Sequence, residues 1–202
     1  MIRGFYPIVD DSYTPDFPAY KLAEEILSSG VGLLQLRQKN LSEKDFLKLA
    51  QEISYLKIHN SFTLIINHFV EVAQKIGADG VHLGSTSISI REARKIMGPK
   101  ALIGASVHSI DEGIEKEKEG ANYLTFGAIY PTATKGVDHP VQGIEKLREL
   151  VQKVSIPVVA IGGITLANVQ EVLKTGAAAF SVITAISRSK NPAESARDFF
   201  IG

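Results

Sequence analysis

The chain has 202 residues, 45% hydrophobic and 22% charged, with 22 basic residues balancing 22 acidic ones, so no net field attracts nucleic acid or an anionic membrane surface. Cysteine is absent, which excludes disulfides, thiolate metal sites and a cysteine nucleophile and suits a reducing compartment. No apolar run approaches the roughly 18 residues of a membrane helix, and the N-terminus has no signal-peptide pattern. We therefore expect a cytoplasmic protein with one domain over residues 1–202.

Eight short apolar runs recur along the chain, and a longer amphipathic stretch follows each of them. Continuous apolarity over four to six residues predicts strands buried on both faces, as in a parallel sheet. The predicted strands are 5–9, 33–36, 63–66, 80–83, 102–106, 123–126, 158–161 and 179–183. Among the predicted helices, 42–56 begins at Ser42, which can cap its first turn, and 110–119 carries its apolar residues on one face.

Four predicted helices end in a glycine that stands just before the next strand, at Gly30, Gly77, Gly120 and Gly176. Glycine best accepts the left-handed conformation that closes a helix. Because these glycines precede every second strand, the chain repeats a unit of two strands and two helices. This pattern predicts an α/β protein with a (β/α)8 TIM barrel. The alternative, an open doubly wound sheet, would carry a glycine-rich first turn, where this chain has Asp10-Asp11-Ser12.

Polar side chains follow the second, third and fifth predicted strands, at the end of the barrel where such enzymes hold their chemistry. Gln35, Arg37 and Lys39 occupy alternate positions and are expected to point to one side of the extended chain. Two cations and an amide suit a phosphate or pyrophosphate; the alternative is that both cations are solvated charges at a strand end. Asn67 and Ser106 follow the neighbouring strands.

The last strands predict a second anion site. Glycines 162 and 163 follow the seventh strand and Ile183-Thr184 closes the eighth, where barrels often bind phosphate on backbone amides; the alternative is that the glycines serve only a tight turn. The long loop 131–142 carries Thr132, Thr134 and Lys135, which would close over a phosphate. We therefore expect a phosphorylated small molecule as ligand.

The five histidines are the natural acid–base candidates near neutral pH. We expect His59 on the surface, His82 packed within its strand, and His108 bonded at a helix start. His68, just past the third strand, and His139, in the long loop, are better placed for chemistry. No histidine spacing resembles a helical metal motif, and no metal ligand is predicted.

These strand-end motifs resemble the thiamine phosphate synthase/TenI superfamily of (β/α)8 barrels over essentially the whole chain. The resemblance rests on Gln35-x-Arg37-x-Lys39, Asn67, and the segments 80–84, 106–109, 126–135, 161–164 and 183–187. It implies a thiazole phosphate as ligand. With the strand-end positions, it assigns substrate binding to Gln35, Arg37, Lys39, Asn67, Ser106, Thr132, Thr134, Lys135, Gly162, Gly163, Ile183 and Thr184.

The superfamily has two branches, and the chain departs from both. The resemblance implies that the synthase joins thiazole phosphate to hydroxymethylpyrimidine pyrophosphate and releases pyrophosphate, with Mg²⁺ held by two aspartates. Those positions align with His68 and Ser87. The TenI branch similarly lacks the aspartates and carries an Asp-Asp-Ser like Asp10-Asp11-Ser12. Its members are thiazole tautomerases, which need no metal, but their histidine after the sixth strand aligns with Ala128.

From these departures we expect a metal-independent TenI-like thiazole tautomerase, an isomerase with no cofactor. His68 and Lys135 are its expected catalytic residues, with His68 moving the proton from the vacated metal-ligand position. One alternative is a thiamine phosphate synthase, a transferase, with Mg²⁺ held by a rearranged site that uses Asp10 or Asp11. The other is a non-catalytic regulator that binds thiazole phosphate. The expected partner is a small phosphorylated heterocycle, and a homodimer is left open.

Overall fold

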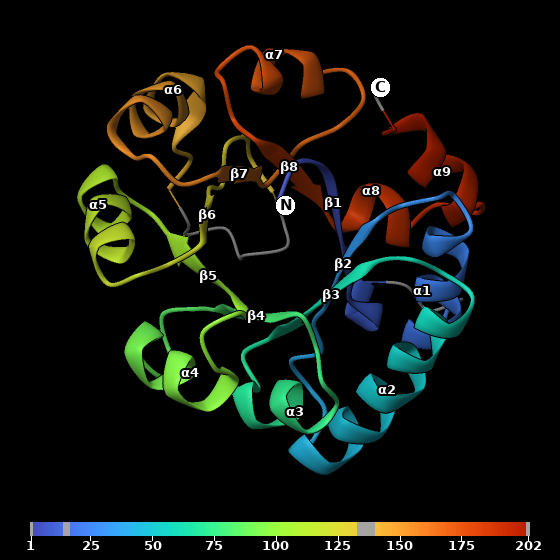
Figure 1. Cartoon of the computed structure of the whole chain (residues 1–202). Helices are drawn as coiled ribbons and strands as arrows, with labels where there is room; N and C mark the ends of the chain where they lie inside the picture. The colour runs from blue at the N-terminus through green and yellow to red at the C-terminus, as the bar shows by residue number, and fades with distance from the viewer. Residues whose placement is uncertain (1, 14–16, 133–139, 201–202) are drawn as a thin grey trace.

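The computed structural model describes residues 2–13, 17–132 and 140–200, whose strands close into a parallel barrel in the order β1 to β8. Figure 1 shows the ring of strands with the helices around it. The strands are β1 Gly4–Val9, β2 Leu33–Leu36, β3 Thr63–Asn67, β4 Gly80–Leu83, β5 Leu102–Val107, β6 Tyr123–Phe126, β7 Val158–Ile161 and β8 Ala179–Val182. The predicted (β/α)8 barrel is confirmed, and every predicted strand end lies within one residue of the observed one.

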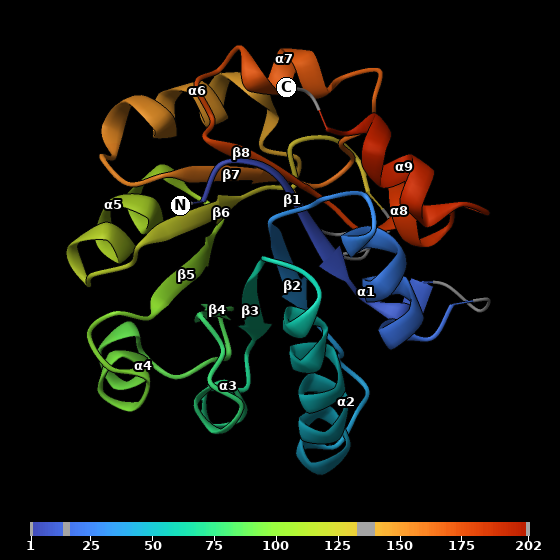
Figure 2. The ribbon, with the colours of Figure 1, turned by 45° about the vertical axis from the view of Figure 1, so that its right-hand side comes forward.

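The helices alternate with the strands, and α9 packs against both α1 and α8 (Figures 1 and 2). Their bounds are α1 Ala19–Leu27, α2 Glu43–Tyr55, α3 Val70–Lys75, α4 Ile90–Met97, α5 Ile110–Lys118, α6 Gly143–Lys153, α7 Val169–Leu173, α8 Thr184–Ser187 and α9 Pro192–Asp198, with 3-10 turns η1 Asp11–Tyr13 and η2 Leu56–Ile58. Ser42 caps α2 as predicted, accepting the Asp45 N–H at 3.2 Å. Of the helices in the described ranges, none is long and apolar enough to cross a membrane.

The glycines predicted to end helices adopt the left-handed backbone that this position requires. Gly30, Gly77, Gly120 and Gly176 have φ between +65° and +98°. A residue with a Cβ would be strained there. The repeat of two strands and two helices in the sequence therefore reflects a repeated way of turning the chain back into the barrel.

The inside of the barrel changes from apolar to polar along the strands. Near their N-terminal ends, a small core contains Ile2, Tyr6, Leu33, Ile65, Tyr123, Val159 and Ala179. Two residues further along, the same inward-facing positions hold Gln35 after Leu33, Asn67 after Ile65 and Thr125 after Tyr123. A larger apolar core fills the space between the strands and the surrounding helices. The polar end of the interior is the end at which a site can be built.

Gly104 allows two large side chains to meet inside the barrel. In the strand register it stands between His82 of β4 and Tyr123 of β6. A Cβ at position 104 would lie 2.1 Å from the Tyr123 Cζ atom. The Tyr123 ring is fully buried and its hydroxyl is bonded to both Tyr6 and His82, so the ring has no free space into which it can move.

Gly104→Ala is therefore expected to lower the free energy of unfolding by about 3 kcal/mol, at the upper end of the cost of overpacking a core. Urea denaturation measures this change. Gly32→Ala is the matched control, because a Cβ at position 32 meets nothing within 4 Å. Equal stability of the two variants would show that the Tyr123 ring is not held in this place.

Candidate active site

Two cavities open at the C-terminal ends of the strands in the described part of the chain, and a smaller one joins them. The first, of about 610 Å³, is lined by Arg37, Gln38, Lys39, Asn67, His68, Phe69, Gly84, Ser85, Thr86, Ser87, Ser106 and His108. The second, of about 420 Å³, is lined by Pro131, Thr132, Ser181, Val182, Arg188 and the segments 161–165 and 183–185. The third, of about 80 Å³, shares residues with both.

Arg37 is held at the edge of the first cavity by a buried carboxylate. Asp10, at the end of β1, is fully buried and pairs with the Arg37 guanidinium. Its other carboxylate oxygen accepts the Ser12 N–H at 3.1 Å. The alternative that Arg37 is a solvated charge is therefore wrong, because its side chain is only 13% exposed. Both Asp10 carboxylate oxygens are thus bonded to protein groups, which does not suit the rearranged metal site expected at Asp10 or Asp11; the Asp11 side chain lies outside the described part of the structure.

Lys39 adds a second positive charge to the same cavity. The charge of Arg37 lowers the pKa of Lys39 from its ordinary value, and partial burial lowers it further. Gln35 points inward from the same strand, but it lies lower in the barrel, where it is almost fully buried and lines the small joining cavity. The cavity thus concentrates two cations within a short stretch of chain, which is a favourable place for an anion with several oxygens.

His68 and Ser87 lie next to each other on the wall of the first cavity. His68 follows β3 with φ of 67°, a backbone that histidine, asparagine and aspartate accept better than most residues. Its Nδ1 atom lies 2.9 Å from the Ser87 hydroxyl. The two positions at which the resemblance implies metal-binding aspartates are therefore bonded to each other.

The described residues do not fit the Mg²⁺ that the resemblance implies. Mg²⁺ prefers carboxylate and other oxygen ligands in near-octahedral geometry, whereas His68 offers an imidazole and Ser87 a neutral hydroxyl. Within residues 2–13, 17–132 and 140–200, no group of three or more histidine, cysteine, aspartate or glutamate side chains could hold a metal ion.

The second cavity has a backbone wall made by two glycines after β7. Gly162 and Gly163 have φ of 99° and 67°. A Cβ on Gly163 would lie 2.7 Å from the Pro131 carbonyl oxygen, so this turn packs closely against the segment that follows β6. Ile183 and Thr184 form the start of α8 at the other side. Thr132 lines the cavity, while Thr134, Lys135 and His139 lie outside the described residues.

Arg188, Ser181 and His82 are among the cavity-lining residues that were not predicted as site residues. Arg188 lines the second cavity and follows Thr184 by four positions, the spacing of one helical turn, which could have indicated it. Ser181 lines the same cavity; its buried Oγ has no hydrogen-bond partner within the described ranges. It precedes Ile183 by two residues, so strand periodicity places both on one face. His82 lines the joining cavity.

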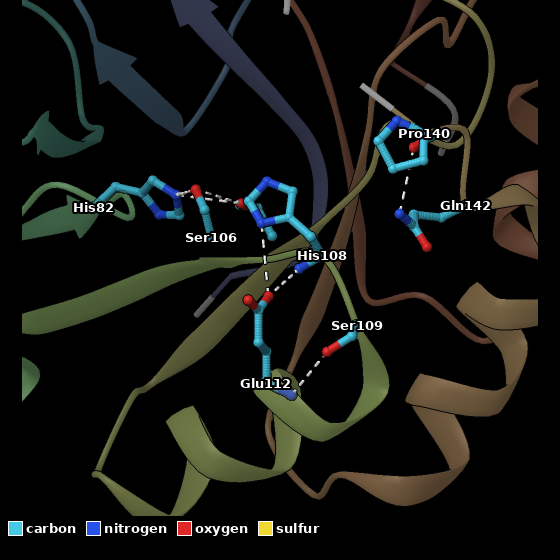
Figure 3. A network of polar contacts seen from close by, with 8 residues as sticks. His82, Ser106, His108, Ser109, Glu112, Pro140 and Gln142 are labelled. Atoms are coloured by element: carbon cyan, nitrogen blue, oxygen red, sulfur yellow. Dashed lines mark hydrogen bonds and ion pairs between the residues drawn. The ribbon is translucent and has the colours of Figure 1, made fainter. Parts of the chain in front are cut away.

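His82 and His108 differ in their surroundings (Figure 3). His82 points toward Ser106, with its Nε2 atom 2.9 Å from the Ser106 hydroxyl, so it does more than pack. His108 lies at the start of α5, where its Nδ1 atom is 3.6 Å from the Glu112 carboxylate, as expected of a residue bonded at a helix start. His59 is exposed at the end of η2, as predicted.

A closed (β/α)8 barrel with a cation-lined and a glycine-lined cavity at its C-terminal end is typical of barrels that bind phosphorylated ligands. The chain belongs to the thiamine monophosphate synthase family, whose model matches residues 5–186. It is 39% identical to a thiamine-phosphate synthase of Clostridium acetobutylicum over 195 residues, which cover 96% of this chain and 92% of that protein.

Two further relatives support membership of the same family. A thiamine-phosphate synthase of Methanospirillum hungatei is 37% identical over 98% of this chain and 97% of its own length. The solved structure of thiamine phosphate pyrophosphorylase from Pyrococcus furiosus superposes with a TM-score of 0.88, at 35% identity, covering 97% of this chain and 93% of that one.

These relatives overturn the expected tautomerase and its placement in the TenI-like branch. Similarity over nearly the whole chain points to synthases, whereas the tautomerase expectation depended on His68 and Ser87 in place of aspartates and on the Asp10-Asp11-Ser12 turn. Such local departures carry less weight than agreement along the whole barrel. The role of His68 as the proton-transfer group depended on the tautomerase reaction and is not carried forward.

Proposed function

We propose that this protein is a thiamine phosphate synthase, a transferase that joins thiazole phosphate to hydroxymethylpyrimidine pyrophosphate. The observation that carries the proposal is the pair of cavities joined by a third. A tautomerase acts on one phosphorylated ring and needs one anion site. Two anion sites with a shared space between them suit two phosphorylated substrates whose reacting atoms must meet.

The first cavity is the proposed site of the pyrophosphate. When the new carbon–nitrogen bond forms, the carbon–oxygen bond to pyrophosphate breaks, and pyrophosphate leaves with the electron pair as added negative charge. Fixed cations stabilise charge that develops in this way, and Arg37 and Lys39 are in place for it. Asn67 and Ser106 add neutral polar groups on the same wall.

The second cavity is the proposed site of the thiazole phosphate. Gly162 and Gly163 let the phosphate approach the backbone closely, and Thr184 lies at the start of a short helix. Arg188 places a positively charged side chain on the wall of this cavity. We also assign substrate binding to Thr132, and to Thr134 and Lys135 of the loop that follows it.

The joining cavity is the proposed place of bond formation. Ile8, Ile161 and Ile183 give it an apolar wall opposite the polar side chains of its floor. An apolar wall excludes water from the carbon that loses pyrophosphate, which favours attack by the thiazole over hydrolysis.

The test supplies both substrates and measures thiamine phosphate and released pyrophosphate in equal amounts. Binding of both substrates without product would contradict the proposal and favour the non-catalytic regulator. Product formed from each substrate alone would also contradict it.

Gly163→Ala is expected to weaken thiazole phosphate binding at least about tenfold, because the added Cβ presses on the Pro131 carbonyl and moves the wall of the second cavity. Calorimetric titration with thiazole phosphate measures the change. Gly98→Ala is the matched control: Gly98 also has a positive φ, of 83°, but a Cβ there meets nothing within 4 Å. An equal loss of affinity in both variants would show that backbone strain alone, rather than the contact with Pro131, causes it.

A further inference from the structure

Six inward-facing side chains form a continuous series of hydrogen bonds inside the barrel. Asn67 donates to Gln35 at 3.1 Å and Gln35 donates to the Tyr6 hydroxyl at 2.9 Å. The Tyr6 and Tyr123 hydroxyls are 2.8 Å apart, the Tyr123 hydroxyl is 3.2 Å from His82 Nδ1, and His82 Nε2 is 2.9 Å from Ser106 Oγ. The series begins and ends at two residues that line the first cavity, Asn67 and Ser106.

The bonds of this series have one direction. Because Gln35 donates its amide N–H to Tyr6, the Tyr6 proton goes to its other partner, Tyr123. The Tyr123 proton then goes to His82 Nδ1. Burial raises the pKa of both tyrosines well above their ordinary value, so both phenols keep the protons that this direction requires.

With the Tyr123 proton directed to Nδ1, His82 accepts there and carries its own proton on Nε2. The Nε2–H group faces the Ser106 hydroxyl at 2.9 Å (Figure 3) and the Thr125 hydroxyl at 3.2 Å. Thr125 in turn donates to Ser106 Oγ at 3.4 Å. The Ser106 oxygen therefore accepts two hydrogen bonds from inside the barrel. Its own proton is left to point into the cavity.

We propose that His82 is a positioning residue for the first cavity: it holds the Ser106 oxygen from below and so presents the Ser106 hydroxyl proton to a bound anion. His82 is 97% buried (3% exposed) and acts through Ser106. The inference rests on the proposed function in that the anion is the pyrophosphate group. The barrel interior then does more than fill space, because a series of five hydrogen bonds through it sets the orientation of the Ser106 hydroxyl in the cavity.

The experiment titrates wild-type protein and variants with inorganic pyrophosphate, and separately with thiazole phosphate, by calorimetry. His82→Leu is expected to weaken pyrophosphate binding about tenfold, the value of one hydrogen bond to a charged group. Thiazole phosphate binding is expected to change less than about twofold, because that ligand occupies the other cavity. His82→Gln, which keeps a donor and an acceptor, is expected to restore most of the pyrophosphate affinity.

A double-mutant cycle separates positioning from general loosening of the fold. Ser106→Ala alone is expected to match His82→Leu, and the double variant is expected to lose no more than either single one, because His82 acts through the hydroxyl. Should His82→Leu not fold, Tyr123→Phe replaces it; this change removes the donor to Nδ1 and is expected to weaken pyrophosphate binding in the same direction.

Three results would overturn the inference. Additive losses in the double variant would mean that His82 acts independently of Ser106. Equal losses for both ligands would mean a general structural effect. Tighter pyrophosphate binding in His82→Leu would mean that the Ser106 proton points inward in the wild type. That arrangement results if the side-chain amides of Asn67 and Gln35 are both turned over, which reverses the direction of every bond in the series. In each case the wild type still makes thiamine phosphate; absence of that product would instead defeat the proposed function.

Discussion

Arg37→Met is expected to lower the free energy of unfolding by about 3 kcal/mol and to abolish measurable pyrophosphate binding. The stability loss follows from Asp10, which is fully buried and would keep a negative charge with no partner. Removing one member of a buried ion pair costs about 3–5 kcal/mol, mostly because of the charge left behind. The binding loss follows from removal of a cation at the edge of the first cavity. Urea denaturation and calorimetric titration with pyrophosphate measure the two effects.

The double variant Asp10→Asn/Arg37→Met separates these effects. Removing the charge of Asp10 relieves the buried carboxylate, so most of the lost stability is expected to return. Pyrophosphate binding is expected to stay lost, because the cation is still absent. Recovery of both properties would mean that Arg37 serves only the ion pair and takes no part in binding.

His68→Asp/Ser87→Asp is expected to create a dependence on Mg²⁺. The two positions are adjacent on the wall of the first cavity, since their side chains are within hydrogen-bonding distance in the wild type. Aspartate also tolerates the positive φ of His68. Two carboxylates beside a bound pyrophosphate supply the ligands that Mg²⁺ usually takes from protein and substrate together. Mg²⁺ is expected to tighten pyrophosphate binding to the variant at least about tenfold more than binding to the wild type.

The control is His68→Asn/Ser87→Asn, which has the same shape without the charge. Calorimetry with pyrophosphate, in Mg²⁺ and in a chelator, gives the ratio of the two pyrophosphate affinities for the wild type, the aspartate variant and the asparagine variant. Equal Mg²⁺ effects in the wild type and the aspartate variant would show that carboxylates at these two positions do not determine metal binding in this chain.

The sequence predicts the barrel well because its strands are apolar on both faces and its repeating helices end in glycine. These signals are local: the role of Gly30 and of Gly176 can be recognised from the few residues of the turn in which each one stands. The cations of the site are also predictable, because Arg37 and Lys39 follow a strand at the expected end. Gln35 lies deeper in the barrel than these two cations. Its depth depends on how the barrel closes, and the alternation of side chains along a single strand does not predict that.

The hydrogen-bonded interior is the part that the sequence does not predict. His82 stands in the run Gly80–Leu83, and such a run predicts a buried strand without telling which partners lie across the barrel. Its partners Ser106 and Tyr123 are 24 and 41 positions away. The choice of branch failed for a related reason: it depends on local departures at His68 and Ser87, and these do not show how similar the whole chain is to each branch.

Gly104 has a consequence for how this sequence can change over evolutionary time. The Tyr123 ring occupies the space that any side chain at position 104 would need, so substitutions at the two positions are not independent. A lineage could enlarge position 104 only after position 123 had become small, and that first step would sever the link between Tyr6 and His82. The order of accepted changes is thus constrained, and we expect the two positions to covary among relatives.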